Sequence, residues 1–261
     1  MKRNLISIVA LTGTLLLAGN VWASPLGQEI TISDNESSTN YDWYSDREDN
    51  EVEPGMLRSQ AWDLEGFFLD GTKLSTVGGF DFVNGVPNYP AFTSGDLFLD
   101  VTGDATYGVD GANIRNGYDY VLDLDFGTNS FNVFKIDDNA TLLDVANYNR
   151  PESSPWKYGS GGTEVVGAGG SIEYIGYADF ANNYGEMGLY GGMGKHNAFT
   201  VDLSFLLGMN DFTGEFISHF TQGCGNDNLM GQGAPVPEPA TMLLFGTGLV
   251  GLAGAARRRK K

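Results

Sequence analysis

The sequence contains little cysteine and little positive charge, and it lacks the pattern of a long amphipathic helix. Cys224 is the only cysteine among 261 residues, so no disulfide can form within the chain. Apolar residues do not keep the helical period over any long window, and only Leu203–Met209 suits a single helical turn. No internal repeat of the length used by solenoid proteins is present. A β-rich domain stabilised by packing is the remaining candidate.

Positive charge is scarce, and nearly half of it lies at the two termini. The chain has 15 Lys and Arg residues against 33 Asp and Glu residues. Seven of the cations are Lys2, Arg3 and residues 257–261. Only one acid, Glu238, lies in these ends, so residues 24–235 carry 8 cations, 32 acids and a net charge near −24. Such a domain repels anionic lipid and anionic polysaccharide unless divalent cations intervene, and we exclude nucleic acid as a partner.

The N-terminus has the three-part layout of a secretory signal peptide. Two cations precede the apolar stretch Leu5–Ala18, and the small-x-small sequence Val21–Ala23 follows it. The apolar stretch is short for a membrane span. We predict that residues 1–23 are a signal peptide, used by the secretory translocon and cut between Ala23 and Ser24. A retained N-terminal anchor is the alternative.

The C-terminus combines a proline-bounded glutamate, an apolar segment and a basic end. The uncharged residues 241–256 would form a helix of about 24 Å, and Ala240 with the aliphatic stem of Arg257 closes most of the gap to a hydrocarbon core of about 30 Å. The basic end keeps the C-terminus in the cytoplasm, which agrees with export of the preceding region. The two prolines resist helix and leave an accessible segment outside the bilayer. The predicted sorting signal is Val236, Pro237, Glu238 and Pro239, and the predicted membrane stop is Arg257, Arg258, Arg259, Lys260 and Lys261.

This order of elements at the very terminus resembles the PEP-CTERM sorting signal of Gram-negative bacteria. The resemblance covers residues 236–261. It implies that exosortase, a membrane-embedded processing enzyme, cuts near Pro237–Pro239 and releases or transfers the protein. It also implies an inner-membrane precursor, a final place on the outer surface or in the extracellular matrix, and an association with exopolysaccharide and biofilm. An ordinary C-terminal anchor that contains Pro-Glu-Pro is the alternative.

Between the two ends, short β-rich runs alternate with Gly, Asn and Asp turns. In Tyr118–Phe126 the even positions are Tyr, Tyr, Leu, Leu and Phe, whereas three odd positions are Asp. This period of two indicates a strand with one face in the core and one in water, and residues 126–130 fit a hairpin turn into the next strand. The predicted strands are Ala61–Leu69, Lys73–Val77, Phe80–Val83, Asp96–Val101, Tyr118–Phe126, Ser130–Ile136, Thr141–Val145, Thr163–Val166, Ser171–Ala178, Ala198–Leu203 and Gly214–Thr221, with a shorter one at Glu29–Ile32.

These runs predict an all-β protein with one β-sandwich, jelly-roll or lectin-like, over residues 56–234. An acidic N-terminal arm or loop, residues 24–55, precedes this domain. The sorting tail, residues 235–261, follows it and contains the predicted transmembrane helix.

One turn sequence combines residue types that are used in nucleophilic catalysis. His219, Cys224 and Asp227 lie within nine residues, with Asn226 beside them. This grouping permits a nucleophile–base–orienter interpretation, or a redox or metal contact. The glycines on either side of Cys224 favour a tight structural turn with a packed thiol, and similar endings are familiar from other proteins that bear this tail. We expect the structural turn, and we expect the second histidine, His196, at the edge of a strand.

Acidic side chains are the better candidates for a bound ion. Asp96, Asp100 and Asp104 surround one predicted strand and its turn, and Asp137 and Asp138 follow another. Carboxylate oxygens clustered in loops suit calcium, which accepts six to eight oxygen ligands in irregular geometry. No Asp-x-Asp-x-Asp-Gly loop is present, so these residues are candidates by composition, and solvated turn acids are the alternative. Calcium is the one candidate cofactor.

Together these features predict a non-catalytic exported protein that acts in adhesion, glycan binding or scaffolding. Loop aromatics such as Trp156 and Tyr158 suit stacking on the sugar rings of a polysaccharide. The alternative is a secreted carbohydrate-active enzyme on a lectin-like sandwich, which needs two carboxylates about 5–10 Å apart across a cleft. A third interpretation, a thiol-linked surface protein, requires an exposed Cys224.

Overall fold

The computed structural model describes residues 25–33, 52, 56–57, 59–105, 117–147, 154–184 and 195–236. The predicted signal peptide, with its cleavage position between Ala23 and Ser24, lies outside these residues. So do Pro237–Pro239, the predicted membrane helix and Arg257–Lys261. Within the part of the chain that is described, no helix combines the length and the apolar character that crossing a bilayer requires.

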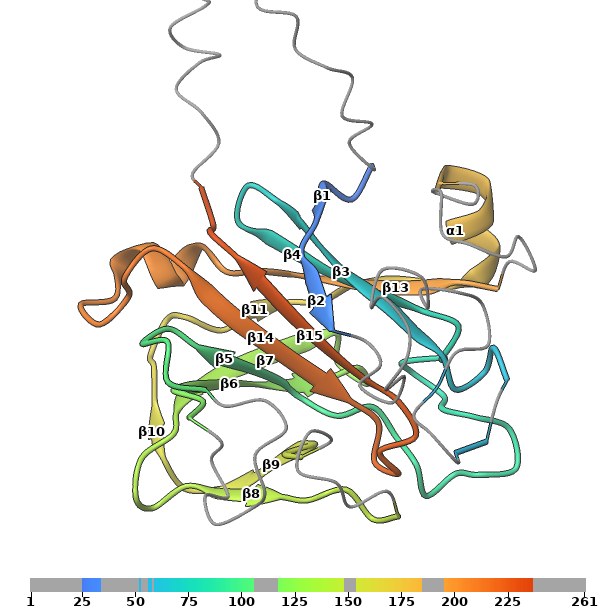
Figure 1. Ribbon diagram of the computed structural model, residues 1–261, viewed down its shortest axis with the longest axis horizontal. Coiled ribbons are helices and arrows are strands. Elements are labelled where there is room, and N and C mark those ends of the chain that lie inside the picture. The colour runs from blue at the N-terminus through green and yellow to red at the C-terminus, as the bar shows by residue number, and fades with distance from the viewer. Residues whose placement is uncertain are drawn as a thin grey trace, which may run out of the picture.

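The described residues form mostly antiparallel β-sheet with one short α-helix, as expected for an all-β protein (Figure 1). One open sheet has the order β1 (Gln28–Glu29), β3 (Leu64–Asp70), β4 (Lys73–Gly78), β13 (Asn197–Asp202) and β12 (Glu173–Ile175). The larger open sheet has the order β10 (Thr163–Glu164), β7 (Ser130–Lys135), β6 (Tyr120–Asp125), β5 (Leu97–Asp100), β14 (Phe216–Thr221), β15 (Asn228–Gly233) and β2 (Thr31–Ser33), and β11 (Gly170–Ser171) also pairs with β7. A separate pair joins β8 (Thr141–Leu143) to β9 (Lys157–Ser160).

The two larger sheets face each other across the main hydrophobic core. Phe67 and Phe199 enter this core from the five-stranded sheet, and Leu122 and Phe220 enter it from the larger sheet. The Phe199 and Phe220 rings lie 5.4 Å apart. Burial of each such side chain contributes about 1.5–3 kcal/mol, so this interface between the sheets is a principal source of stability. A jelly-roll or lectin-like topology stays a prediction.

Strand β6 has the predicted alternation, but both of its faces are covered. Tyr120, Leu122 and Leu124 belong to the main core. On the opposite face Val121 is 0% exposed, because it packs in a second cluster with Leu142 of β8. The hairpin from β6 into β7 is confirmed, since the two strands pair in register through the predicted turn.

One predicted strand is wrong, and a second is wrong in part. Phe80–Val83 is a turn, because the Asp81 carboxylate accepts the backbone N–H groups of Val83 and Asn84 at 3.0 and 2.9 Å. The predicted strand Ser171–Ala178 ends early, and helix α1 (Tyr177–Tyr184) begins inside it. The reason is tertiary: Phe180 of α1 is buried on the outer face of the five-stranded sheet. The expected single turn near residues 203–209 is the 3₁₀-helix η2 (Ser204–Gly208).

Strand β15 was not predicted, because its glycine-rich sequence reads as a linker. It pairs with β14 at six successive positions. A Cβ atom at Gly231 would lie 2.8 Å from the Phe67 ring of the facing sheet, so the absence of a side chain there permits close packing. Strand β9 was also not predicted, and it pairs with β8 over the second cluster.

The first described segment, residues 25–33, joins the two larger sheets at one edge. The Ile30 N–H donates to the Phe67 carbonyl at 2.9 Å, and the Ile30 carbonyl accepts the Gln232 N–H at 2.9 Å. Residue 30 is therefore hydrogen-bonded to both sheets, with β1 on one side and β2 on the other. Outside residues 25–33, the predicted arm has one more described residue, Val52, which is buried in the main core. These parts of residues 24–55 thus belong to the folded domain.

Candidate functional site

The last described residue, Val236, lies directly before the proline-bounded glutamate and is hydrogen-bonded to the domain. Strand β15 ends at Gly233, and the Val236 N–H donates to the Gly71 carbonyl in the turn between β3 and β4 at 3.1 Å. Pro235 is buried, and the Val236 side chain is 59% exposed. The chain is therefore fixed to the fold up to the residue that precedes Pro237.

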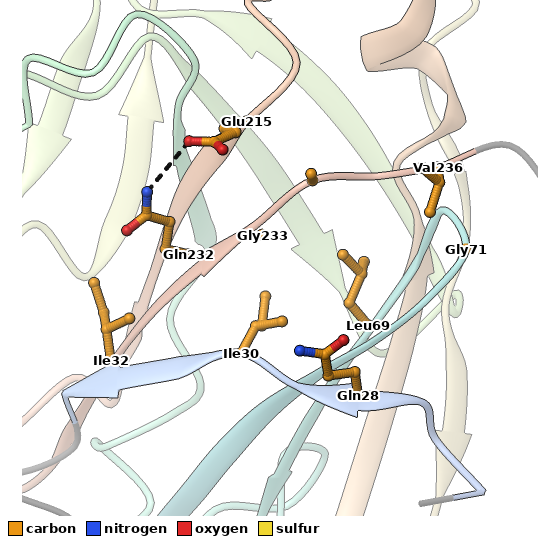
Figure 2. A pocket seen from close by; sticks show the side chains of 10 residues that line it. Gln28, Ile30, Ile32, Leu69, Gly71, Glu215, Gln232, Gly233 and Val236 are labelled. Carbon is orange, nitrogen blue, oxygen red and sulfur yellow. Dashed lines mark hydrogen bonds between the residues drawn. The ribbon is translucent and has the colours of Figure 1, made fainter. Parts of the chain in front are cut away.

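A surface hollow of about 440 Å³ lies beside this attachment (Figure 2). Its apolar wall contains Ile30, Ile32 and Leu69, which come from the first described segment and from the end of β3. Its polar rim contains Gln232 and Glu215, whose side chains are joined by a hydrogen bond of 3.4 Å. Glu215 is the one acidic side chain among the residues that line this hollow.

The turn between β14 and β15 contains Cys224, Asn226 and Asp227 of the candidate turn sequence. Polar side chains of this turn hold distant segments of the chain together. The Asp227 carboxylate accepts the Leu64 N–H at 2.6 Å and the Asn228 N–H at 2.8 Å. The Gln222 side chain donates to the Trp62 carbonyl and accepts the Asp227 N–H at 3.1 Å. This turn therefore fixes the start of β3 through side chains that replace backbone partners.

Asn226 makes a second connection of the same kind. Its side-chain oxygen accepts the Leu57 N–H at 3.2 Å, and its side-chain nitrogen donates to the Leu57 carbonyl at 3.1 Å. The amide thus pairs with residue 57 as a neighbouring strand would. Asn226 is only 3% exposed, so this pairing lies inside the domain and is shielded from solvent.

His219 and Cys224 point into different clusters. His219 lies inside β14, its ring stacks on Tyr118 at 5.5 Å, and its Nε2 atom is 3.0 Å from the Pro155 carbonyl oxygen. Cys224 is a free cysteine, 2% exposed, in the main core. Burial lowers the pKa of His219 to about 4 and raises the pKa of Cys224 to about 11. A neutral thiol separated from a neutral imidazole gives no activated nucleophile.

The second histidine lies at the beginning of a strand, as expected, and it is buried. His196 precedes β13 and is 3% exposed. Its Nδ1 atom lies 2.7 Å from a carboxylate oxygen of Glu65, which also accepts a hydrogen bond of 2.7 Å from Gln60. No local pattern indicates this pair, since the two residues are 131 positions apart in the chain.

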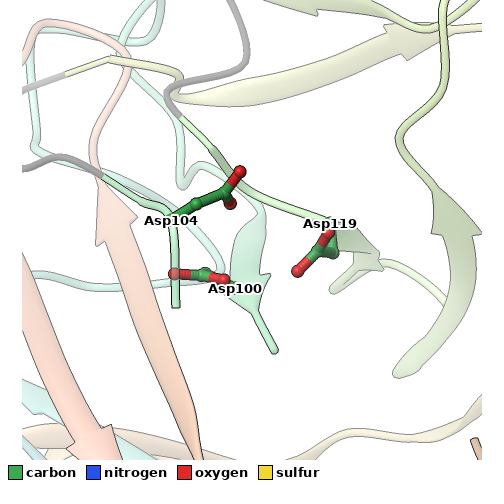
Figure 3. A group of neighbouring side chains, drawn as sticks. All are labelled: Asp100, Asp104 and Asp119. Atoms are coloured by element: carbon green, nitrogen blue, oxygen red, sulfur yellow. The ribbon is translucent and has the colours of Figure 1, made fainter. Parts of the chain in front are cut away.

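Three carboxylates meet at the end of β5, but they are not the predicted set. Oxygen atoms of Asp100, Asp104 and Asp119 lie within 4.8 Å of one another (Figure 3). Asp100 and Asp104 were predicted as calcium ligands, whereas Asp119 was assigned only to the solvated face of a strand. It joins the group because its N–H pairs with Leu99 at the end of β5, and burial is the largest cause of its raised pKa.

Backbone groups already occupy much of this cluster. Asp100 accepts the N–H groups of Gly103 at 2.7 Å and Ala105 at 2.8 Å, and it is 1% exposed. Asp119 accepts the Val101 N–H at 2.8 Å. The carboxylates therefore close the turn after β5, which satisfies their charge with N–H donors.

The other predicted calcium ligands lie elsewhere. The Asp96 carboxylate accepts the N–H groups of Leu124 of β6 at 3.0 Å and Tyr158 of β9 at 2.7 Å. Asp96 directly precedes β5, so its side chain holds β6 and β9 together where β5 begins. Asp96 is 0% exposed, and burial raises its pKa to about 7. Asp137 accepts hydrogen bonds from the Asn139 N–H and the Thr163 hydroxyl, and Asp138 beside it is exposed. None of the three belongs to the carboxylate group at the end of β5.

The predicted sugar-stacking aromatics are partly engaged in packing. Tyr158 stacks on Phe134 with ring centroids 4.5 Å apart. Trp156 is half-buried, and Lys157 lies over its ring. Tyr89, in the loop between β4 and β5, is 44% exposed. Tyr89 is therefore a better-placed aromatic surface than the two that the sequence singled out.

The comparison with known families identifies the segment that follows the domain. Residues 235–260 match the PEP-CTERM protein-sorting motif. No curated protein and no solved structure matches the chain. The motif begins at Pro235, two residues after β15 ends. The next residue, Val236, is the one that is hydrogen-bonded to Gly71. The chain is thus an exported protein with a PEP-CTERM sorting motif, whose membrane-anchored precursor is processed by an exosortase.

Proposed function

We propose that the mature domain is a non-catalytic protein of the outer surface or extracellular matrix, with an adhesion, glycan-binding or scaffolding role linked to exopolysaccharide. The observation that supports a binding role best is the exposed aromatic surface at Tyr89. Its ring lies 5.4 Å from Trp62 in an edge-to-face contact and stacks on Phe92 at 6.3 Å. Two supporting rings restrict the motion of Tyr89, so little conformational entropy is lost when a sugar ring stacks on it.

A binding role is also consistent with how the acidic groups are used. Asp96, Asp100 and Asp227 are buried and accept backbone N–H groups, so their carboxylates have a structural task. The hollow beside Val236 has Glu215 as its one lining acid, whereas a typical glycosidase uses two carboxylates. The net charge near −24 favours a neutral glycan, or an anionic one bridged by divalent cations.

Binding of the exported protein to exopolysaccharide from the producing cells tests the proposal. The Tyr89→Ala variant should bind about fivefold more weakly, since loss of one stacked aromatic costs on the order of 1 kcal/mol. Tyr177→Ala is the matched control, because Tyr177 is 45% exposed but lies on α1. Equal affinity of the Tyr89→Ala variant and the parent would contradict the proposed surface. Release of reducing sugar by the parent protein would contradict the non-catalytic role.

A further inference from the structure

The connection between the folded domain and the sorting motif is very short. Val236 is attached to Gly71 through its N–H, and Pro237 is the next residue. An extended chain advances at most about 3.6 Å per residue, so Pro239 stays within about 11 Å of Val236. A processing enzyme that holds Pro237–Pro239 must therefore come close to the part of the domain around Val236.

We infer that this end of the domain is the surface that contacts the exosortase during processing. The surface comprises the hollow walled by Ile30, Ile32 and Leu69, its rim at Glu215 and Gln232, and the turn at Gly71 (Figure 2). These residues come from the first described segment (residues 25–33), the end of β3 and its following turn, the residue before β14, and β15. The four segments meet beside Val236. The contact follows from the short connection and does not depend on the function of the mature domain.

The chemistry of this surface favours a protein partner over a lipid headgroup layer. Glu215 and Asp70 are exposed near Gly71, and the domain is strongly acidic, so anionic headgroups are repelled. The apolar wall of Ile30, Ile32 and Leu69 offers area that a protein side chain can fill. Gln232 and Glu215 form a polar rim on one side of this wall, and polar rims beside apolar contact area are typical of protein interfaces.

Site-specific photocrosslinking in the full-length precursor tests the inference. A photoreactive amino acid is placed at Gln232, and in a second strain at Glu215, both of which are exposed rim positions. Val166 is the control, because it is 88% exposed and lies between β10 and β11 at the opposite edge of the larger sheet. The precursor is expressed with a catalytically inactive exosortase, so that the motif remains bound.

We expect crosslinks to the exosortase from Gln232 and Glu215 and none above background from Val166. A Gly/Ser spacer of about ten residues between Val236 and Pro237 spans roughly 16–19 Å and should abolish these crosslinks, while the active enzyme still processes the protein. Absence of crosslinks at both rim positions, in a precursor that active exosortase processes normally, would overturn the inference. Crosslinks that the spacer leaves unchanged would also overturn it, since the contact would not depend on the short connection.

Discussion

The Asp227 carboxylate accepts a 2.6 Å hydrogen bond from the backbone N–H of Leu64, which lies 163 residues earlier in the chain. Asp227 belongs to the turn between β14 and β15, and Leu64 is the first residue of β3, so the bond joins the two facing sheets. Both residues are buried. The turn that contains the free cysteine is therefore a structural junction of the domain.

Loss of this junction should destabilise the protein. Asp227→Ala leaves the N–H groups of Leu64 and Asn228 buried without that acceptor, so we expect the free energy of unfolding to fall by about 2 kcal/mol or more. Urea unfolding of the exported protein measures this change. Asp144→Ala, at an exposed carboxylate, is the control and should stay within about 0.5 kcal/mol of the parent. Equal stabilities of the two variants would contradict the structural role.

Asp96 should make stability depend on pH. Its pKa is raised by burial from the ordinary value of 3.8 to about 7, so between these values the folded protein holds a proton that the unfolded chain has released. The contribution of Asp96 to the free energy of unfolding is therefore largest below about pH 4, and it decreases as the pH rises towards 7. In Asp96→Asn this titration is absent. The difference in free energy of unfolding between the parent and the variant should therefore decrease from pH 4 to pH 7. Urea unfolding at several pH values in this range measures the difference. A difference that does not change with pH would contradict the prediction.

Asp100 should stabilise the turn after β5 without a metal ion. Asp100→Asn weakens acceptance of the Gly103 and Ala105 N–H groups, so we expect a loss of about 1–3 kcal/mol in the presence of a chelator. Asp104→Asn is the control, since that side chain is exposed and should have a smaller effect. Thermal unfolding with chelator and with added calcium distinguishes the outcomes. A loss that appears only with calcium would show that the carboxylates act through the ion.

Cys224 should be protected in the folded protein. Its side chain is 2% exposed and burial raises its pKa to about 11, so little thiolate forms at neutral pH. A thiol reagent should modify it slowly in buffer and rapidly in denaturant. The non-reduced exported protein should have the mass of an unmodified thiol. A disulfide-linked partner on Cys224 would support the thiol-linked interpretation instead.

Substitutions in the sorting tail should affect processing and membrane retention separately. Replacing Pro237, Glu238 and Pro239 by alanine should leave full-length protein in the inner membrane, because the enzyme no longer recognises the motif. Replacing Arg257–Arg259 by alanine should weaken retention of the precursor, whereas replacement by lysine keeps the charge and should preserve retention. Immunoblots of membrane and external fractions measure both. Normal maturation of the first variant would contradict the role of the motif.

The sequence alone was sufficient for features that depend on neighbouring residues. The alternation in Tyr118–Phe126 specifies a strand because successive side chains point to opposite faces of a sheet, and β6 follows that pattern. The sorting tail is equally local, since a proline-bounded glutamate, an apolar segment and a basic end occur in order within residues 235–260. Each of these can be read from a short window.

The tertiary structure alone decided which distant residues meet. Asp119 joins Asp100 because β5 and β6 pair side by side, and Glu65 meets His196 across 131 residues. Strand β15 forms from a glycine-rich sequence because β14 and the facing Phe67 supply its partners. The position of Val236 beside the hollow follows from its bond to Gly71. Such contacts depend on how the two sheets pack, and no local pattern in the chain encodes that packing.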